Sequence, residues 1–242
     1  MQLTSAQPLT EQQLAGGAAP RAEARVPAAA RPVTRRLLLA GAVAGPLFIL
    51  TVLVQDYTRP DFDPRIYPLS MLSLGDWGWV QMANFALAGV LNLVYAVGLW
   101  RSLHPGRAGT WGPLLIGAYG LGLITVGVFT TDPANGFPPG AVASTEPSGH
   151  GVIHALGGLF TFVVLTAALG VFVRFFLARH ERWWAVYCLA SAVAVLVLFF
   201  GGINNPALVA RTLRLAMFVG WMAASVTGMK LLSVTAAPQH AA

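Results

Sequence analysis

Two histidines and two aspartates are the residues whose types and spacing could support metal chemistry. His150 and His154 are four residues apart, which on a helix places both imidazoles on one face. Such a pair can offer two nitrogens to one metal ion. Asp132 or Asp63 could add a carboxylate as the third ligand that catalytic zinc sites with an open position require. The spacing therefore makes zinc or another divalent metal a candidate cofactor.

The same pair also fits a structural or proton-handling role. The segment lacks the glutamate of an H-E-x-x-H motif, which supplies the general base of that motif. Two histidines at the start of a helix can instead hydrogen-bond the neighbouring loops. If the chain is an enzyme, the candidate catalytic residues are Asp132, Asp63 and Ser70, and metal binding by His150, His154 and Asp132 stays open beside the structural interpretation.

A second pattern is a polar stripe on an apolar segment. Gln81, Asn84, Asn92 and Tyr95 fall within an arc of about 80° at 100° per residue, so they share one helix face. Such a face meets protein or water and not lipid. Interhelical hydrogen bonding, worth roughly 0.6 kcal/mol per bond in membranes, is favoured over a polar substrate path because no ionisable group joins the stripe.

The composition identifies the environment that must hold these residues. The chain has 242 residues, of which 56% are hydrophobic and only 10% are charged, against roughly 25% charged in an average soluble domain. The single Cys188 excludes a disulfide framework and a thiolate metal cluster. The chain is therefore expected to be a polytopic membrane protein whose main partner is the lipid bilayer.

The gaps between charges predict where helices cross the bilayer, because a charge at its centre costs roughly 2.5 to 3.5 kcal/mol. They predict an all-α bundle of six transmembrane helices within a membrane domain at 35–234. Residues 1–34, rich in Ala, Pro, Gln and Arg, are expected to form a disordered cytoplasmic tail, and 235–242 a short cytoplasmic one. The expected helices are about 36–55, 78–100, 111–131, 150–174, 183–203 and 212–233.

The basic residues predict the orientation, since Arg and Lys are retained on the cytoplasmic side. With both termini inside, four of the fifteen Arg and Lys residues lie outside, namely Arg59, Arg65, Arg211 and Arg214. The net charge of +6 thus reflects topology and does not indicate nucleic-acid binding. Six of the nine acidic residues and the pair His150 and His154 fall in or beside the outer loops, so any site is expected to face outward.

Several short motifs occur in order along the chain. They are Asp63-Pro64, Ser70, Ser73, Gly75, Gly78-Trp79, Gln81, Asn84-Phe85, Val128-Phe129, Thr131-Asp132-Pro133, Phe137-Pro138-Pro139-Gly140, His150-Gly151, His154 and Gly157. These motifs resemble those of a bacterial integral-membrane family catalogued as domain of unknown function 998. The resemblance covers about 36–233 and implies a six-helix protein of the bacterial inner membrane, without an established activity.

The sequence thus describes an uncharacterised multi-pass membrane protein with an outward-facing acidic and histidine cluster. Three functions remain open. The chain could be a metal-dependent membrane hydrolase that acts on a lipid, a small-solute transporter, or a non-catalytic protein that binds lipid or assists assembly. The first needs the histidine and aspartate cluster, and the second needs a polar route through the bilayer.

Overall fold

The computed structural model describes residues 31–142 and 146–236. Within these residues the fold is all helical, as predicted, with six helices long and apolar enough to cross a membrane. The expected tails at 1–30 and 237–242 lie outside the described residues. The helices are α2 (Arg31–Thr58), α3 (Gly78–Leu103), α4 (Arg107–Val128), α5 (Gly149–Ala178), α6 (Arg182–Ile203) and α7 (Val209–Ala236), with a short 3-10 helix η2 (Leu69–Ser73) between α2 and α3.

The observed helix boundaries differ from the expected ones by up to five residues, and α2 and α4 show the clearest departures. Helix α2 begins at Arg31, so residues 31–34, which we expected in the tail, form its first turn. Helix α4 begins at Arg107 and ends at Val128, where Phe129 turns to an extended conformation, so residues 129–131 are not helical. Charges mark the limits of the hydrocarbon layer, whereas hydrogen bonding and the following Pro133 determine where helices begin and end.

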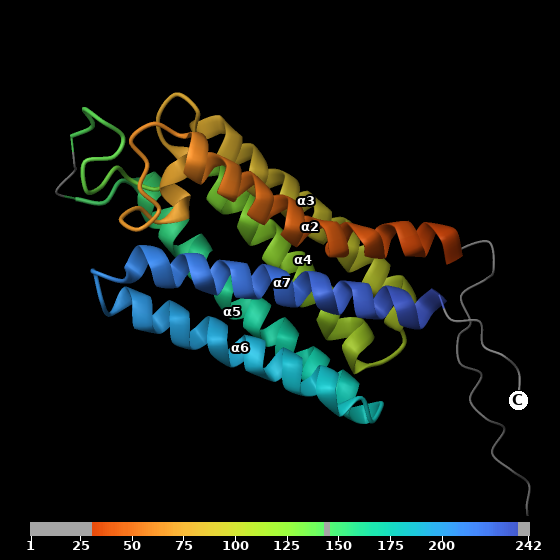
Figure 1. The fold of residues 1–242 in the computed structure, drawn as a ribbon. Coiled ribbons are helices and arrows are strands. Elements are labelled where there is room, and N and C mark those ends of the chain that lie inside the picture. Colours follow the sequence, from red (N-terminus) through yellow and green to blue (C-terminus); the bar gives the residue numbers. More distant parts are fainter. Residues whose placement is uncertain (1–30, 143–145, 237–242) are drawn as a thin grey trace, which may run out of the picture.

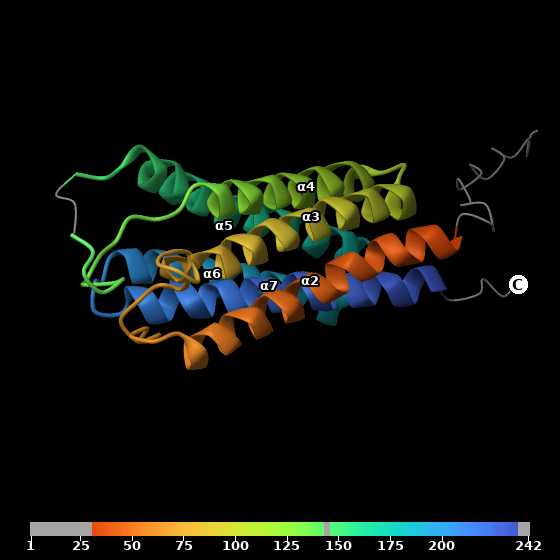
Figure 2. The same ribbon diagram turned by 90° about the horizontal axis from the view of Figure 1, so that it is seen from above.

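The six helices form a closed ring with alternating directions (Figures 1 and 2). Each helix packs against its neighbours in the sequence, and α2 packs against α7 to close the ring. Both described ends of the chain lie at one end of the bundle, which we call the termini end (Figure 1). The described parts of the long connections, residues 59–77, 129–142 and 146–148, lie at the opposite end, the loop end.

Large aromatic side chains fill the middle of the ring. Phe48 of α2 stacks on Trp221 of α7, with ring centroids 4.9 Å apart, and Tyr119 of α4 lies 5.4 Å from the same indole. Phe85 of α3 contacts Phe48 at 5.3 Å. All four rings are buried, so side chains from α2, α3, α4 and α7 meet in one core near the bundle axis.

Glycines allow α3 and α4 to approach backbone to backbone. A Cβ atom on Gly120 of α4 would lie 2.7 Å from the carbonyl oxygen of Gly89 of α3, and one on Gly89 would lie 2.6 Å from the carbonyl oxygen of Gly120. These distances are too short for any other residue at either position. The glycine-rich α4 therefore packs tightly on α3, as small residues do between membrane helices.

Candidate functional site

The loop end is covered by a cap made of residues 59–74 and 133–141. The rings of Phe62, Tyr67 and Phe137 contact one another at 5.1 to 5.6 Å, and the Tyr67 hydroxyl donates to the carbonyl of Asn135 at 3.3 Å. The two connections therefore pack together. The Arg59 guanidinium fastens the first of them by donating to the carbonyls of Leu72 and Leu74 at 2.9 and 2.6 Å.

Asp132 lies at the N-terminus of α5. Its two carboxylate oxygens accept hydrogen bonds from the Ser148 hydroxyl at 2.5 Å and the Ser148 backbone N–H at 2.9 Å. Ser148 is the N-cap of α5 and accepts from the Gly151 N–H at 3.0 Å. Donation from Ser148, helped by the nearby histidines His150 and His154, holds the pKa of Asp132 below its usual range. A negative charge at a helix N-terminus is also stabilised by the helix dipole.

Gly151 is needed for this arrangement. A Cβ atom at position 151 would collide with the Asp132 carboxylate. The carboxylate therefore lies directly against the first turn of α5, where the helix offers unpaired N–H groups. The motif residues His150-Gly151 and Asp132 are thus explained by one capping contact.

His154 connects α5 to the end of α4. Its Nδ1 atom lies 2.8 Å from the carbonyl oxygen of Phe129 and 3.1 Å from that of Val126. Because carbonyls only accept hydrogen bonds, Nδ1 is assigned the ring hydrogen, which leaves Nε2 as an acceptor. His154 therefore pairs carbonyls at the C-terminal end of α4, which have no partner within the helix.

The other candidate residues are distributed around the same end of the molecule. His150 is exposed and lies edge-on to the Phe129 ring at 5.2 Å. Asp63 accepts from the Arg65 N–H at 2.8 Å within a turn of the cap. The carbonyl of Ser70 accepts from the Ser73 hydroxyl at 2.6 Å. Asp63 and Ser70 thus shape the cap, whereas Asp132, His150 and His154 gather at the start of α5.

These three residues do not form a ready metal centre. Among residues 31–142 and 146–236, no group of three His, Cys, Asp or Glu side chains is arranged to hold a metal ion. The physical reason is that Asp132 is engaged with Ser148 and the Nδ1 atom of His154 with the end of α4. In this arrangement His154 joins α5 to the end of α4, and Asp132 joins the preceding loop to the start of α5.

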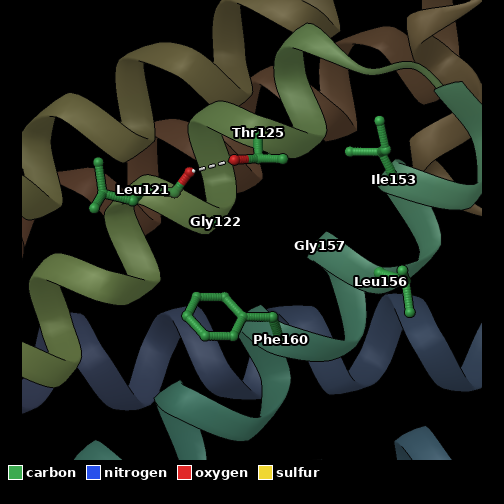
Figure 3. Close-up of a pocket in the computed structure, with 7 residues that line it drawn as sticks. All are labelled: Leu121, Gly122, Thr125, Ile153, Leu156, Gly157 and Phe160. Atoms are coloured by element: carbon green, nitrogen blue, oxygen red, sulfur yellow. Dashed lines mark hydrogen bonds between the residues drawn. The ribbon is translucent and has the colours of Figure 1, made fainter.

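An apolar groove lies between α4 and α5 in the half of the bundle nearer the loop end (Figure 3). It has a volume of about 440 Å³ and is lined by Leu121, Gly122, Thr125, Ile153, Leu156, Gly157 and Phe160. The Thr125 hydroxyl donates to the Leu121 carbonyl at 3.0 Å, so its donor is already used. Leu121 and Leu156 are about 60% exposed, so the groove opens on the outer, lipid-facing side of the bundle.

The groove and the histidine and aspartate cluster adjoin one another. Ile153, which lines the groove, directly precedes His154. Thr125 on the other wall lies one turn before Phe129, whose carbonyl pairs with His154. The polar cluster therefore lies at the end of an apolar groove.

The predicted polar stripe of α3 faces the interior, where all four side chains are buried. Gln81 accepts from the Gln55 side chain of α2 at 2.8 Å and from Asn84 at 3.3 Å. Asn92 donates to the Ala88 carbonyl of its own helix at 2.8 Å. The Tyr95 hydroxyl has no hydrogen-bond partner among the described residues. The stripe thus makes two contacts with α2, from Gln81 to Gln55 and from Asn84 to the Phe48 carbonyl, and two hydrogen bonds within α3.

Sequence reasoning missed an ion pair between α2 and α7. Asp56 and Arg214 meet at 2.5 Å, with side chains only 6% and 11% exposed. Arg214 also donates to the Tyr67 carbonyl of the cap at 3.3 Å. Both residues were expected to be charges on the outer surface. The only signal in the sequence was an acid and a base at the same expected depth, and pairing them requires knowing that α2 and α7 are neighbours.

Several buried polar atoms in the same half of the bundle have no hydrogen-bond partner among the described residues. Leaving such a group unpaired costs about 1 to 3 kcal/mol, and a typical protein is stable by only about 5 to 15 kcal/mol. The unpaired atoms are Gln55 Oε1, Asp56 Oδ1, Gln81 Nε2, the Tyr119 hydroxyl, Arg214 Nε and Trp221 Nε1.

Comparison with known proteins identifies the family. Neither curated proteins nor solved structures gave a match to this chain. The model of one family, Protein of unknown function (DUF998), matches residues 42–231. This range runs from α2 to α7 and includes the cap, the groove and the cluster at the start of α5. The chain therefore belongs to the family described as Protein of unknown function (DUF998), as its sequence motifs predict.

Proposed function

We propose that this multi-pass membrane protein binds a membrane lipid, with an acyl chain in the groove between α4 and α5. The groove itself carries the proposal. Its volume of about 440 Å³ falls within the range of roughly 300 to 1,000 Å³ that is typical of ligand pockets. It is lined by side chains of two membrane-spanning helices, so the hydrocarbon chains of the membrane lipids surround it.

The chemistry of the lining supports an acyl chain over a polar solute. The apolar side chains offer no hydrogen bond, and the Thr125 hydroxyl already donates a hydrogen bond to the Leu121 carbonyl. The cluster of Asp132, His150 and His154 at the outer end of the groove would meet the lipid head group. His154 Nε2 is the free acceptor there, and Asp132 supplies a negative charge.

A photoactivatable lipid tests this proposal. The purified protein is reconstituted with a phospholipid that carries a diazirine in its acyl chain, and crosslinked peptides are identified by mass spectrometry. We expect crosslinks to concentrate on the α4 and α5 peptides that contain Leu121 and Leu156. Their yield should exceed that of other lipid-facing peptides by at least about five-fold, since a bound chain stays there longer than bulk lipid.

A matched pair of tryptophan variants controls for general exposure to lipid. Thr125→Trp places an indole in the groove and should reduce the α4 and α5 crosslinks to the level of other peptides. Val193→Trp makes a bulky change at an exposed position of α6 outside the groove, and should leave them unchanged. An even distribution of crosslinks in the wild type would contradict lipid binding in the groove.

A metal-dependent lipid hydrolase is the second candidate, because the polar cluster adjoins the groove. Such an enzyme would need Asp132, His150 and His154 to come together around zinc, with Asp63 or Ser70 as further candidate catalytic groups. It would cleave the lipid near its head group. Stoichiometric zinc in gently extracted protein, lost in His150→Ala and His154→Ala, would favour this function over simple binding.

We also propose that the termini end faces the cytoplasm of a bacterial cell and that the protein lies in the inner membrane. The distribution of basic residues supports this orientation. Arg59, Arg65, Arg211 and Arg214 lie at the loop end. The termini end carries Arg35, Arg36, Arg101, Arg107, Arg174, Arg179, Arg182 and Lys230.

A further inference from the structure

Three buried amides in the bundle form one hydrogen-bonded group with a fixed orientation. Asn84 donates to the Phe48 carbonyl at 3.2 Å, so its nitrogen must point toward α2. The same nitrogen donates to Gln81 Oε1, which also accepts from Gln55 Nε2, and Gln55 Nε2 in turn lies 3.3 Å from the Thr51 carbonyl. Exchanging N and O in any of these amides would set two donors or two acceptors against each other.

This fixed orientation leaves one donor and one acceptor unpaired. Gln81 Nε2 and Gln55 Oε1 have no partner among the described residues, although Gln81 and Gln55 are only 0% and 4% exposed. The Phe48 carbonyl fixes the orientation of the Asn84 amide, which in turn fixes the orientations of Gln81 and Gln55. Rotating the amides therefore cannot give the two unpaired atoms a partner. Any partner must therefore come from outside the side chains of this group.

The group continues through Phe48 to two more unpaired atoms. Phe48 stacks on Trp221, and Trp221 contacts Tyr119. Trp221 Nε1 and the Tyr119 hydroxyl are buried and have no hydrogen-bond partner among the described residues. An indole N–H can only donate. Buried hydrogen-bond donors and acceptors without partners among the described residues thus lie along one connected set of side chains, which extends from α2 and α3 to α4 and α7.

The surroundings of this set of side chains determine what kind of molecule can hydrogen-bond to its unpaired atoms. Asp56, which follows Gln55 in the chain, is paired with Arg214, so the set favours an uncharged partner. The cap covers its outer side with Phe62, Leu69 and Leu72, all of them buried. Toward the termini end the core contains large apolar side chains together with Tyr95, whose hydroxyl also has no hydrogen-bond partner among the described residues. The apolar side chains are Leu38, Leu99, Ile116, Leu169, Phe172 and Phe176.

We propose that the half of the bundle interior nearer the loop end is a hydrated recess in which bound water bridges Gln55, Gln81, Tyr119 and Trp221. Water is small and neutral and both donates and accepts, as this mixture of atoms requires. A buried water usually makes two to four hydrogen bonds to polar groups that otherwise have no partner. The cap bounds this recess on its outer side, and the large apolar side chains near the termini end bound it on the other.

Radiolytic labelling tests the proposal on the wild-type protein. A short X-ray pulse converts bound water to hydroxyl radicals, which oxidise the side chains next to it, and the products are quantified by mass spectrometry. After correction for intrinsic reactivity, Trp221 and Tyr119 should be oxidised at least about ten times faster than Phe172 and Phe176. All four are at most 2% exposed, so burial alone predicts equal rates.

Two variants on the same face of α3 locate the water. Gln81→Leu removes the central amide and should lower Trp221 oxidation at least about five-fold. Asn92→Leu removes an equally buried amide whose nitrogen donates to the Ala88 carbonyl of its own helix, and should leave Trp221 oxidation unchanged. Equal slow oxidation of Trp221, Tyr119, Phe172 and Phe176 in the wild type would overturn the proposal even if Gln81→Leu failed to fold.

Discussion

Asp132 is the titratable residue whose environment gives the clearest pH dependence. Hydrogen bonds from Ser148 lower its pKa in the folded protein, so the unfolded chain binds the proton more readily. The resulting stabilisation is present above the unfolded pKa of about 3.9 and is lost as pH falls through the lower, folded value.

The prediction is that Asp132→Asn lowers the melting temperature at neutral pH and that this difference shrinks on acidification. Asparagine cannot carry the charge that accepts from Ser148 and stabilises the N-terminus of α5. Melting in detergent, followed by intrinsic fluorescence between about pH 6 and pH 3 around the carboxyl pKa, measures the difference. A difference that stays constant over this range would mean that the ionised carboxylate does not stabilise the fold.

The residue types and their spacing predicted which side chains share a helix face, but they did not predict which residues those side chains contact. The four stripe residues shared a face by spacing alone, and the structure places all of them in the interior. The partner of Gln81 is Gln55 of another helix, and the Asp56 and Arg214 pair joins residues 158 positions apart. Such contacts depend on which helices are neighbours, which the helical period of one segment does not contain.

At the scale of elements, the contact of α3 with α4 depends on glycine at particular positions. Gly120 faces the Gly89 backbone at a distance that leaves no room for a Cβ atom, whereas a Cβ on Gly117 would meet the Ala96 side chain at an ordinary 3.7 Å. Both glycines lie in the middle of α4, so replacing either with alanine should change the intrinsic helix propensity by a similar amount.

We therefore expect opposite effects from the same substitution. Gly120→Ala should destabilise the protein by about 1 to 3 kcal/mol through overpacking. Gly117→Ala should be neutral or stabilise it by up to about 1 kcal/mol through helix propensity. Thermal unfolding of both variants in one detergent provides the comparison. Similar melting temperatures for the two would show that α3 and α4 do not approach as closely as described.

Helix positions were largely predictable because charges are costly in hydrocarbon, and the six expected segments coincide with the six membrane-spanning helices. Their ends were less predictable. Arg35 and Arg36 are exposed and continue α2 beyond the apolar stretch, since a helix can extend into water where its charges are solvated. The end of α4 depends on His154, which pairs its last carbonyls from another helix.

At the scale of the whole molecule, the closure of the ring by α2 and α7 creates the interior in which the polar groups meet. Short connections join α3 to α4 and α5 to α6, so these pairs are neighbours by chain length alone. The contact between the first and last helices has no such cause. The groove between α4 and α5 could not be predicted from the sequence either. Its lining includes Gly122 of α4 and Gly157 of α5, and the sequence does not give the alignment of these two helices.

Orientation is the last property that follows from the whole distribution of charge. Val142 at the loop end is 90% exposed, and Arg107 is an exposed residue at the start of α4 on the termini end. In a Cys188→Ser background, which removes the one native thiol, a membrane-impermeant maleimide should label Val142→Cys in intact cells. Arg107→Cys should react only after lysis. This expectation rests on the general retention of basic residues on the cytoplasmic side. The reverse labelling pattern would place the cap, the cluster and the proposed hydrated recess on the cytoplasmic side.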